Sequence, residues 1–143
     1  MQSSSQPDLV FYVDECLKSA ALTTALRGAL LKTEAMQVAP KGTLDEDWLP
    51  LVGKVGWVCL SKDRRLIIRP NELAAIVDFK VAMMLFVEAN GAEHARMLLA
   101  ALPLIRRAAK TIPRAFVARV EPRGGLTLLY EGGFKRKRPK AMR

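Results

Sequence analysis

A chain of 143 residues is long enough for one ordinary domain. Half of its residues are hydrophobic, which excludes wholesale disorder, and no apolar run approaches the roughly 18 residues of a membrane-spanning helix. The net charge of +9 favours a polyanion such as nucleic acid, or an acidic protein, as partner. The first residues lack the basic start and apolar stretch of a secretory signal, so we expect a cytosolic protein without a membrane span.

Two cysteines, Cys16 and Cys59, and one histidine, His94, limit the available chemistry. They are too few for a zinc cluster or for a Cys–His nucleophilic arrangement. The apolar surroundings of both cysteines predict small buried side chains, and the charged neighbours of His94 predict a surface position. A metal ion would therefore be a hard cation held by carboxylates.

Strand and helix signals alternate along the chain, with apolar β-prone runs indicating strands and apolar residues at helical spacing indicating helices. In chain order we expect a strand at 9–13, a helix at 17–31, a weak strand at 34–39, a helix from 45 to about 53–56, a strand at 57–60, a helix at 70–76, a strand at 82–87, a helix at 92–110, and strands at 116–120 and 126–130. Thr43 or Asp45 is expected to cap the second helix, and Pro103 to kink or split the last one.

The alternation predicts an α/β fold, a three-layer α/β/α sandwich around a mostly parallel central sheet. The turn signal at 122–125 adds a C-terminal hairpin. We expect a flexible N-terminus at 1–8, one domain at 9–131, and a basic, disordered tail at 132–143. The basic residues of that tail are Lys135, Arg136, Lys137, Arg138, Lys140 and Arg143.

Three acidic segments are expected at one edge of this sheet. Asp14 follows the first strand and Asp63 the third, and parallel α/β sheets bind ligands beyond the carboxyl ends of their strands. The acidic cluster 45–47 opens a helix that begins near the same side. Converging carboxylates repel one another unless a cation lies among them, and Mg²⁺ or Mn²⁺ suits such oxygen ligands. A bound divalent ion activates water and stabilises charge on a phosphodiester.

Basic side chains surround Asp63 in the sequence, where a polyanionic substrate would approach. These candidate substrate-binding residues are Lys62, Arg64 and Arg65. Each acid also has a simpler interpretation: a helix cap for Asp14 and Asp45, a turn residue paired with its arginines for Asp63, and a solvated neighbour for Glu15 and Glu46. Their joint placement favours a site, because caps need not gather at one edge of a sheet.

Three segments resemble the PIN-like domains of bacterial toxin–antitoxin systems: 11–17 (FYVDECL), 44–50 (LDEDWLP) and 56–65 (GWVCLSKDRR). The resemblance extends to the stretch at 112–120 and covers most of 9–120. It implies an α/β/α sandwich and an RNA-cleaving toxin that uses Mg²⁺ or Mn²⁺ and is inhibited by a cognate antitoxin protein. The oligomeric state stays open, a homodimer included.

In this resemblance the family's first acid corresponds to Asp14, its middle acid to Asp45 within the cluster 45–47, and its third acid to Asp63. These three would be the catalytic and metal-binding residues. Further candidate ligands are Glu15 and Glu46. Many PIN nucleases carry another Asp about two residues after the third acid, where this chain has Arg65. The number of metal ions is therefore open, and a non-catalytic PIN-like module that binds RNA or protein is the alternative.

A receiver domain is an alternative from a different class. The pair Asp14–Glu15 and the later Asp63 fit the acidic pair and phospho-acceptor of that doubly wound fold. A receiver also needs Thr or Ser after its fourth strand and Lys after its fifth. Here the fourth predicted strand leads into 88–90 (EAN), and no parallel fifth strand with a Lys is evident. The sequence therefore favours the ribonuclease.

Overall fold

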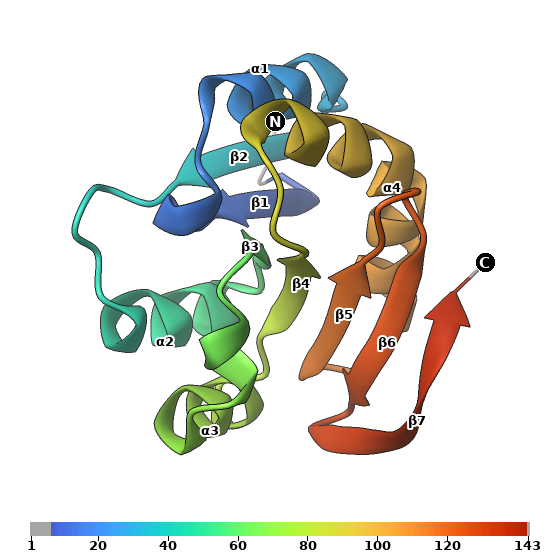
Figure 1. Ribbon diagram of the computed structural model, residues 1–143. Helices are drawn as coiled ribbons and strands as arrows, with labels where there is room; N and C mark the ends of the chain where they lie inside the picture. The colour runs from blue at the N-terminus through green and yellow to red at the C-terminus, as the bar shows by residue number, and fades with distance from the viewer. Residues whose placement is uncertain (1–6, 143) are drawn as a thin grey trace, which may run out of the picture.

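One seven-stranded sheet runs through the computed structural model, which describes residues 7–142. Its strands are β1 (Leu9–Val13), β2 (Glu34–Val38), β3 (Val58–Ser61), β4 (Ala82–Phe86), β5 (Phe116–Val120), β6 (Leu126–Glu131) and β7 (Phe134–Met142). They lie in the order β2-β1-β3-β4-β5-β6-β7 (Figure 1). Strands β1 to β5 are parallel, β6 runs antiparallel to β5, and β7 runs antiparallel to β6. The predicted mostly parallel sheet and its C-terminal hairpin are confirmed.

Helices cover both faces of this sheet, which gives the predicted three layers (Figure 1). The helices and 3₁₀ turns are η1 (Glu15–Leu17), α1 (Ala20–Ala29), α2 (Asp45–Val55), η2 (Arg64–Ile67), α3 (Pro70–Asp78) and α4 (Gly91–Thr111). Within residues 7–142, no helix has the length and apolar content needed to span a membrane.

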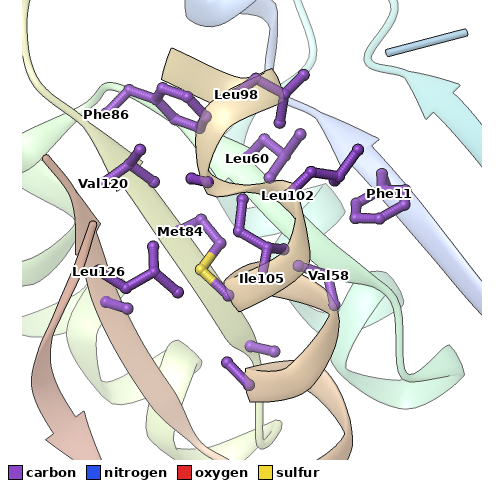
Figure 2. Close-up of a cluster of buried hydrophobic side chains, with 14 of the residues drawn as sticks. Phe11, Val58, Leu60, Met84, Phe86, Leu98, Leu102, Ile105, Val120 and Leu126 are labelled. Carbon is purple, nitrogen blue, oxygen red and sulfur yellow. The ribbon is translucent and has the colours of Figure 1, made fainter. Parts of the chain in front are cut away.

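Two hydrophobic clusters hold the layers together, because successive side chains of a strand point to opposite faces. On β1, Phe11 belongs to the cluster under α1 and α4, whereas its neighbour Tyr12 belongs to the cluster under α2 and α3. Figure 2 shows the first cluster, where Leu102 and Ile105 of α4 meet apolar side chains of the central strands. Strands buried on both faces explain the continuous apolar runs of the sequence.

The C-terminal segment differs from the prediction. The sequence predicts a disordered tail at 132–143, but β7 pairs along β6, with Leu126 opposite Met142 and Leu128 opposite Lys140. Residue 143 lies outside the described residues. A run of cations is compatible with an edge strand, because its outer edge faces water and charged residues with a proline prevent pairing to further strands. Of the predicted flexible segment 1–8, residues 1–6 lie outside the described residues.

Some local predictions are also wrong. The helix α4 continues through Pro103, and the cap position of α2 is Leu44 instead of Thr43 or Asp45. His94 is buried, with 3% of its surface exposed, and its Nε2 forms a hydrogen bond with the carbonyl oxygen of Val87 at 2.8 Å. Cys59 is buried as predicted, whereas Cys16 is exposed.

Close contact between α2 and α3 requires glycine at position 53. A Cβ atom there would overlap the backbone oxygen of Phe79. We expect Gly53→Ala to lower the free energy of unfolding by about 1–3 kcal/mol through this overlap. Gly28→Ala, in open space on α1, is the control and should leave stability equal or raise it by about 0.5–1 kcal/mol. Equal denaturation midpoints for Gly53→Ala and the unchanged protein would contradict the packing argument.

Candidate active site

The point where the strand order reverses lies between β1 and β3, and open α/β sheets bind ligands beyond the carboxyl ends of the strands at this point. Asp14 follows β1, and Asp63 comes two residues after the end of β3. The amide of Asp14 donates to the carbonyl oxygen of Leu60 at 2.9 Å, which ties the two strand ends together. The structure thus brings both acids to one edge, as expected from the sequence.

Asp14 is a buried carboxylate, with 7% of its surface exposed. Its Oδ2 accepts a hydrogen bond from the Ser61 hydroxyl at 2.7 Å and one from the Cys16 thiol at 3.4 Å. Ser61 also accepts the amide of Asp63 at 3.1 Å, so a single hydroxyl links the two acids. Within residues 7–142, no cationic side chain forms an ion pair with Asp14. The site therefore contains a buried carboxyl group that has no cationic partner among these residues.

Asp63 has a different environment, because Arg65 binds both of its carboxylate oxygens. The Nε of Arg65 donates to Oδ1 at 2.9 Å and a terminal nitrogen donates to Oδ2 at 3.1 Å. The amide of Arg65 adds a third bond, at 3.0 Å to Oδ1. Burial by itself raises the pKa of Asp63, but the hydrogen bonds and charge of Arg65 outweigh it and hold the pKa below its usual value. Asp63 thus agrees with its simpler interpretation, a turn residue paired with an arginine.

Asp45 is the first residue of α2, and its Oδ1 accepts the indole N–H of Trp48 at 2.9 Å. Trp48 in turn stacks on Tyr12, with ring centroids 5.3 Å apart, which fixes the position of the carboxylate. Burial raises the pKa of Asp45; the indole hydrogen bond opposes this, and the nearby charges of Asp14, Asp63 and Glu72 add to the rise. Negative charge is therefore concentrated at this edge of the sheet.

Two residues of this environment were missed by sequence reasoning. Glu72 lies in the first turn of α3, and Ser61 is the last residue of β3. The signal for Glu72 was an acid near a helix start, after Pro70. The signal for Ser61 was a hydroxyl residue at the end of a buried strand, two residues before Asp63. Neither signal is specific, because both residue types are common at such positions.

The two glutamates proposed as further ligands have other surroundings than Asp14 and Asp45. Glu15 accepts the amide of Gly42 at 2.9 Å and thereby holds the loop that leads into α2. Glu46 is exposed in the first turn of α2. Of the proposed substrate-binding residues, Lys62 forms an ion pair with Glu88 at 2.9 Å, and Arg64 is exposed.

A divalent cation fits part of this donor set. Within residues 7–142, no group of three or more His, Cys, Asp or Glu side chains is arranged to hold a metal ion. Mg²⁺ keeps several waters, however, and is often bound by one or two carboxylates together with substrate phosphates. Asp14, which is buried and has no cationic partner in the described part of the chain, and Asp45, whose pKa the charges of other acids raise, fit such an ion. Asp63 does not fit it while Arg65 holds both of its oxygens.

A family model described as a PIN like domain matches residues 9–88. The chain belongs to this family. The match contains Asp14, Asp45, Asp63 and Glu72, and ends before α4. The resemblance seen at 112–120 therefore lies outside the matched range. Comparison with curated proteins and with solved structures gave no match. PIN-like domains are commonly nucleases, so the family supports a nuclease-type module.

This PIN-like domain lacks two residues that a receiver needs, the Thr or Ser after the fourth strand and the Lys after the fifth. The strand β5 is a parallel fifth strand, because it pairs in parallel with β4, and it pairs antiparallel with β6. It is followed by Glu121, Pro122 and Arg123, so no lysine stands at its end. The fourth strand leads into Val87 and Glu88, where a receiver needs Thr or Ser.

Proposed function

We propose that this PIN-like domain is a metal-dependent endoribonuclease that hydrolyses RNA phosphodiester bonds with Mg²⁺ or Mn²⁺. The observation that carries the proposal is Asp14, a buried carboxylate at the reversal point of the sheet that has no cationic partner within residues 7–142. Asp45 lies near enough for the charge of Asp14 to raise its pKa. Lys62 and Arg64 supply positive charge beside these acids for the phosphates of RNA.

The chain's own residues have distinct tasks in this reaction. Asp14 and Asp45 would hold the ion, whose chemistry is to lower the pKa of water and to offset negative charge on the phosphate. The Ser61 hydroxyl orients the Asp14 carboxylate, and the Trp48 indole orients Asp45. Both bonds prearrange the carboxylates before substrate binds, which reduces the reorganisation needed in the transition state.

A non-catalytic PIN-like binding module is the second candidate. The observation that favours it is the pair of bonds from Arg65 to Asp63, which occupies a carboxylate that the family resemblance assigns to the metal. RNA cleavage separates the two functions. We expect the purified protein to cleave single-stranded or looped RNA with Mg²⁺ or Mn²⁺ and to lose this activity in EDTA. Intact RNA with either ion would instead support the binding module.

The toxin role is the finer part of the proposal, with a cognate antitoxin protein as inhibitor. Its support is the motif resemblance to toxin–antitoxin PIN-like domains, together with exposed apolar side chains that a protein partner could cover. These are Leu51 and Val55 of α2 and Phe79 after α3. Induced expression of the chain in bacteria should arrest growth, and expression of Asp14→Asn should not. Normal growth with active, abundant protein would contradict the toxin role.

The basic edge strand β7 should contribute to RNA affinity through its charge. Replacing four of its cations by Gln should lower the slope of log affinity against log salt by up to about 3, because fewer counterions are released on binding. The four positions are Lys135, Lys137, Arg138 and Lys140. Substitution is preferred to deletion of the strand, because deletion would expose the edge of β6. RNA binding is measured by titration at several salt concentrations.

The matched control removes four positive charges from the N-terminal part of the chain. Its positions are Lys18, Arg27, Lys32 and Lys54, all outside β7. We expect the control to change the salt slope less than the β7 variant does. Equal slopes for the two variants would show that only net charge matters and that β7 has no particular role.

A further inference from the structure

A second feature of the carboxyl edge is a cavity of about 240 Å³ beyond β4. Its apolar wall includes Ile67 of η2, Leu85 of β4 and Leu129 of β6. Its charged lining consists of three cationic residues, Lys62, Arg64 and Arg119, and one acid, Glu88. The cavity therefore combines an apolar interior with a rim on which cationic residues outnumber the single acid, which is typical of a small-molecule site with a few orienting polar groups.

The cavity and the acidic residues lie side by side along the same edge of the sheet. In the order β1-β3-β4-β5, Asp14 follows β1, whereas the cavity lies at the ends of β3, β4 and β5. Leu85 is paired in register with Ser61 on one side and with Arg119 on the other. Lys62 and Arg64 are the chain neighbours of Asp63, so one loop contributes to both features.

The cations of the rim are not equally available to a ligand. Lys62 forms its ion pair with Glu88, and Arg119 is 3.0 Å from a carboxylate oxygen of Glu121. Arg64 is exposed and has no carboxylate partner within residues 7–142. An anionic group entering the cavity would therefore meet Arg64 without first breaking an ion pair.

Size and chemistry together select the ligand. The volume is below the roughly 300 Å³ at which pockets for whole drug-sized molecules begin, so one flat ring system fits better than an extended ligand. The ligand must also carry negative charge for Arg64 and an apolar surface for Ile67 and Leu129. A nucleotide has both, since its base offers a flat face and its phosphate an anion. An acidic peptide side chain offers the charge without the flat apolar body.

We propose that this cavity binds one nucleotide of the RNA, with the base against Ile67, Leu85 and Leu129 and the phosphate at Arg64. The inference rests on the proposed function in one respect, because it assumes that this nucleotide neighbours the bond cleaved at the acidic edge. The cavity then holds the strand in register with Asp14 and gives cleavage a preference for the base that fits.

Binding of mononucleotides to the metal-free protein tests the cavity directly. The four nucleoside 5′-monophosphates and inorganic phosphate are titrated into the 143-residue chain in EDTA and followed by calorimetry or NMR. We expect at least one nucleotide to bind at least about tenfold more tightly than inorganic phosphate. Equal affinities for phosphate and all four nucleotides would overturn the proposal, because the base would then contribute nothing.

Variants locate the binding. Leu129→Trp and Ile67→Trp each fill the cavity from a different element and should abolish the preference for nucleotide over phosphate. Arg64→Ala should weaken nucleotide binding about tenfold, while Arg123→Ala, an exposed arginine after β5, should leave it unchanged. Thermal melting identifies a filling variant that fails to fold. The result of the other filling variant then decides whether the nucleotide binds in the cavity. Unchanged binding in the folded filling variants and in Arg64→Ala would place the nucleotide elsewhere and overturn the inference.

The same titrations separate this inference from the proposed ribonuclease. RNA cleavage without any nucleotide preference in EDTA would overturn the cavity proposal and leave the ribonuclease intact. Nucleotide binding that the filling variants abolish, in a protein that cleaves no RNA, would overturn the ribonuclease and retain the cavity as the ligand site of a binding module.

Discussion

Asp14→Asn is expected to reduce RNA cleavage by about 100-fold or more while the protein remains folded. Asn keeps the shape of the side chain and still accepts the Ser61 hydroxyl, but it removes the charge and the strong oxygen ligand. The loss should appear in kcat at saturating RNA, because the ion that Asp14 would hold acts at the reacting phosphate and not at distant contacts. Thermal melting in EDTA should show equal or higher stability, since one of several mutually repelling carboxylates is gone.

Two variants on α2 complete this test. Asp45→Asn should also lose most activity, whereas Asp47→Asn, an exposed acid in the same helical turn, should keep it. In Asp14→Asn, NMR titration should find the pKa of Asp45 shifted back toward its ordinary value, because the charge of Asp14 contributes to its rise. Full activity of Asp14→Asn would contradict the carboxylate site, and a loss of folding that matches the loss of activity would make Asp14 structural.

Arg106→Ala is expected to lower the free energy of unfolding at neutral pH by about 3 kcal/mol. Arg106 of α4 donates to both carboxylate oxygens of Glu34 on β2, at 2.8 and 2.9 Å, and to the carbonyl oxygen of Ala29 at the end of α1. The Glu34 side chain is only 4% exposed. Removing the arginine therefore leaves a buried carboxylate without its partner, which costs far more than the loss of a surface ion pair. Urea denaturation measures the change.

The effect of Arg106→Ala should depend on pH with a definite sign. Burial opposes ionisation of Glu34, but the bonds from Arg106 and the Leu31 amide keep its pKa below the usual value. A carboxyl whose pKa is lower in the folded chain stabilises it above the unfolded pKa of about 4.3, and this contribution is lost as the pH falls through the folded pKa. In Arg106→Ala, burial instead favours the protonated acid. The stability difference should thus be largest near neutral pH and shrink below pH 4.

A double variant separates the loss of the ion pair from the loss of packing. Replacing both Glu34 and Arg106 by Met removes both charges and keeps apolar volume, so most of the lost stability should return. A double variant as unstable as Arg106→Ala alone would show that the hydrogen bond to Ala29 or the packing of the arginine stem carries the effect.

The sequence by itself determined the order and type of most elements, from strand 9–13 to strand 126–130. Those signals are local: apolar periodicity sets which residues are buried in a helix or strand, and neighbouring residues set where an element begins and ends. The positions of Asp14 and Asp63 at one edge also followed, because residues after parallel strands meet at the same edge of a sheet.

The tertiary structure decided which groups those acids contact and which surfaces surround them. The pairing of β7 with β6 could not be predicted from the sequence, because a run of cations has no apolar alternation. Strand formation also depends on the neighbouring strand more than on intrinsic preference. Residues far apart in the chain become neighbours in the fold. Glu72 lies near Asp45, and Arg119 of β5 lines the same cavity as Arg64. Such neighbours are set by the packing of helices on the sheet, which no local pattern encodes.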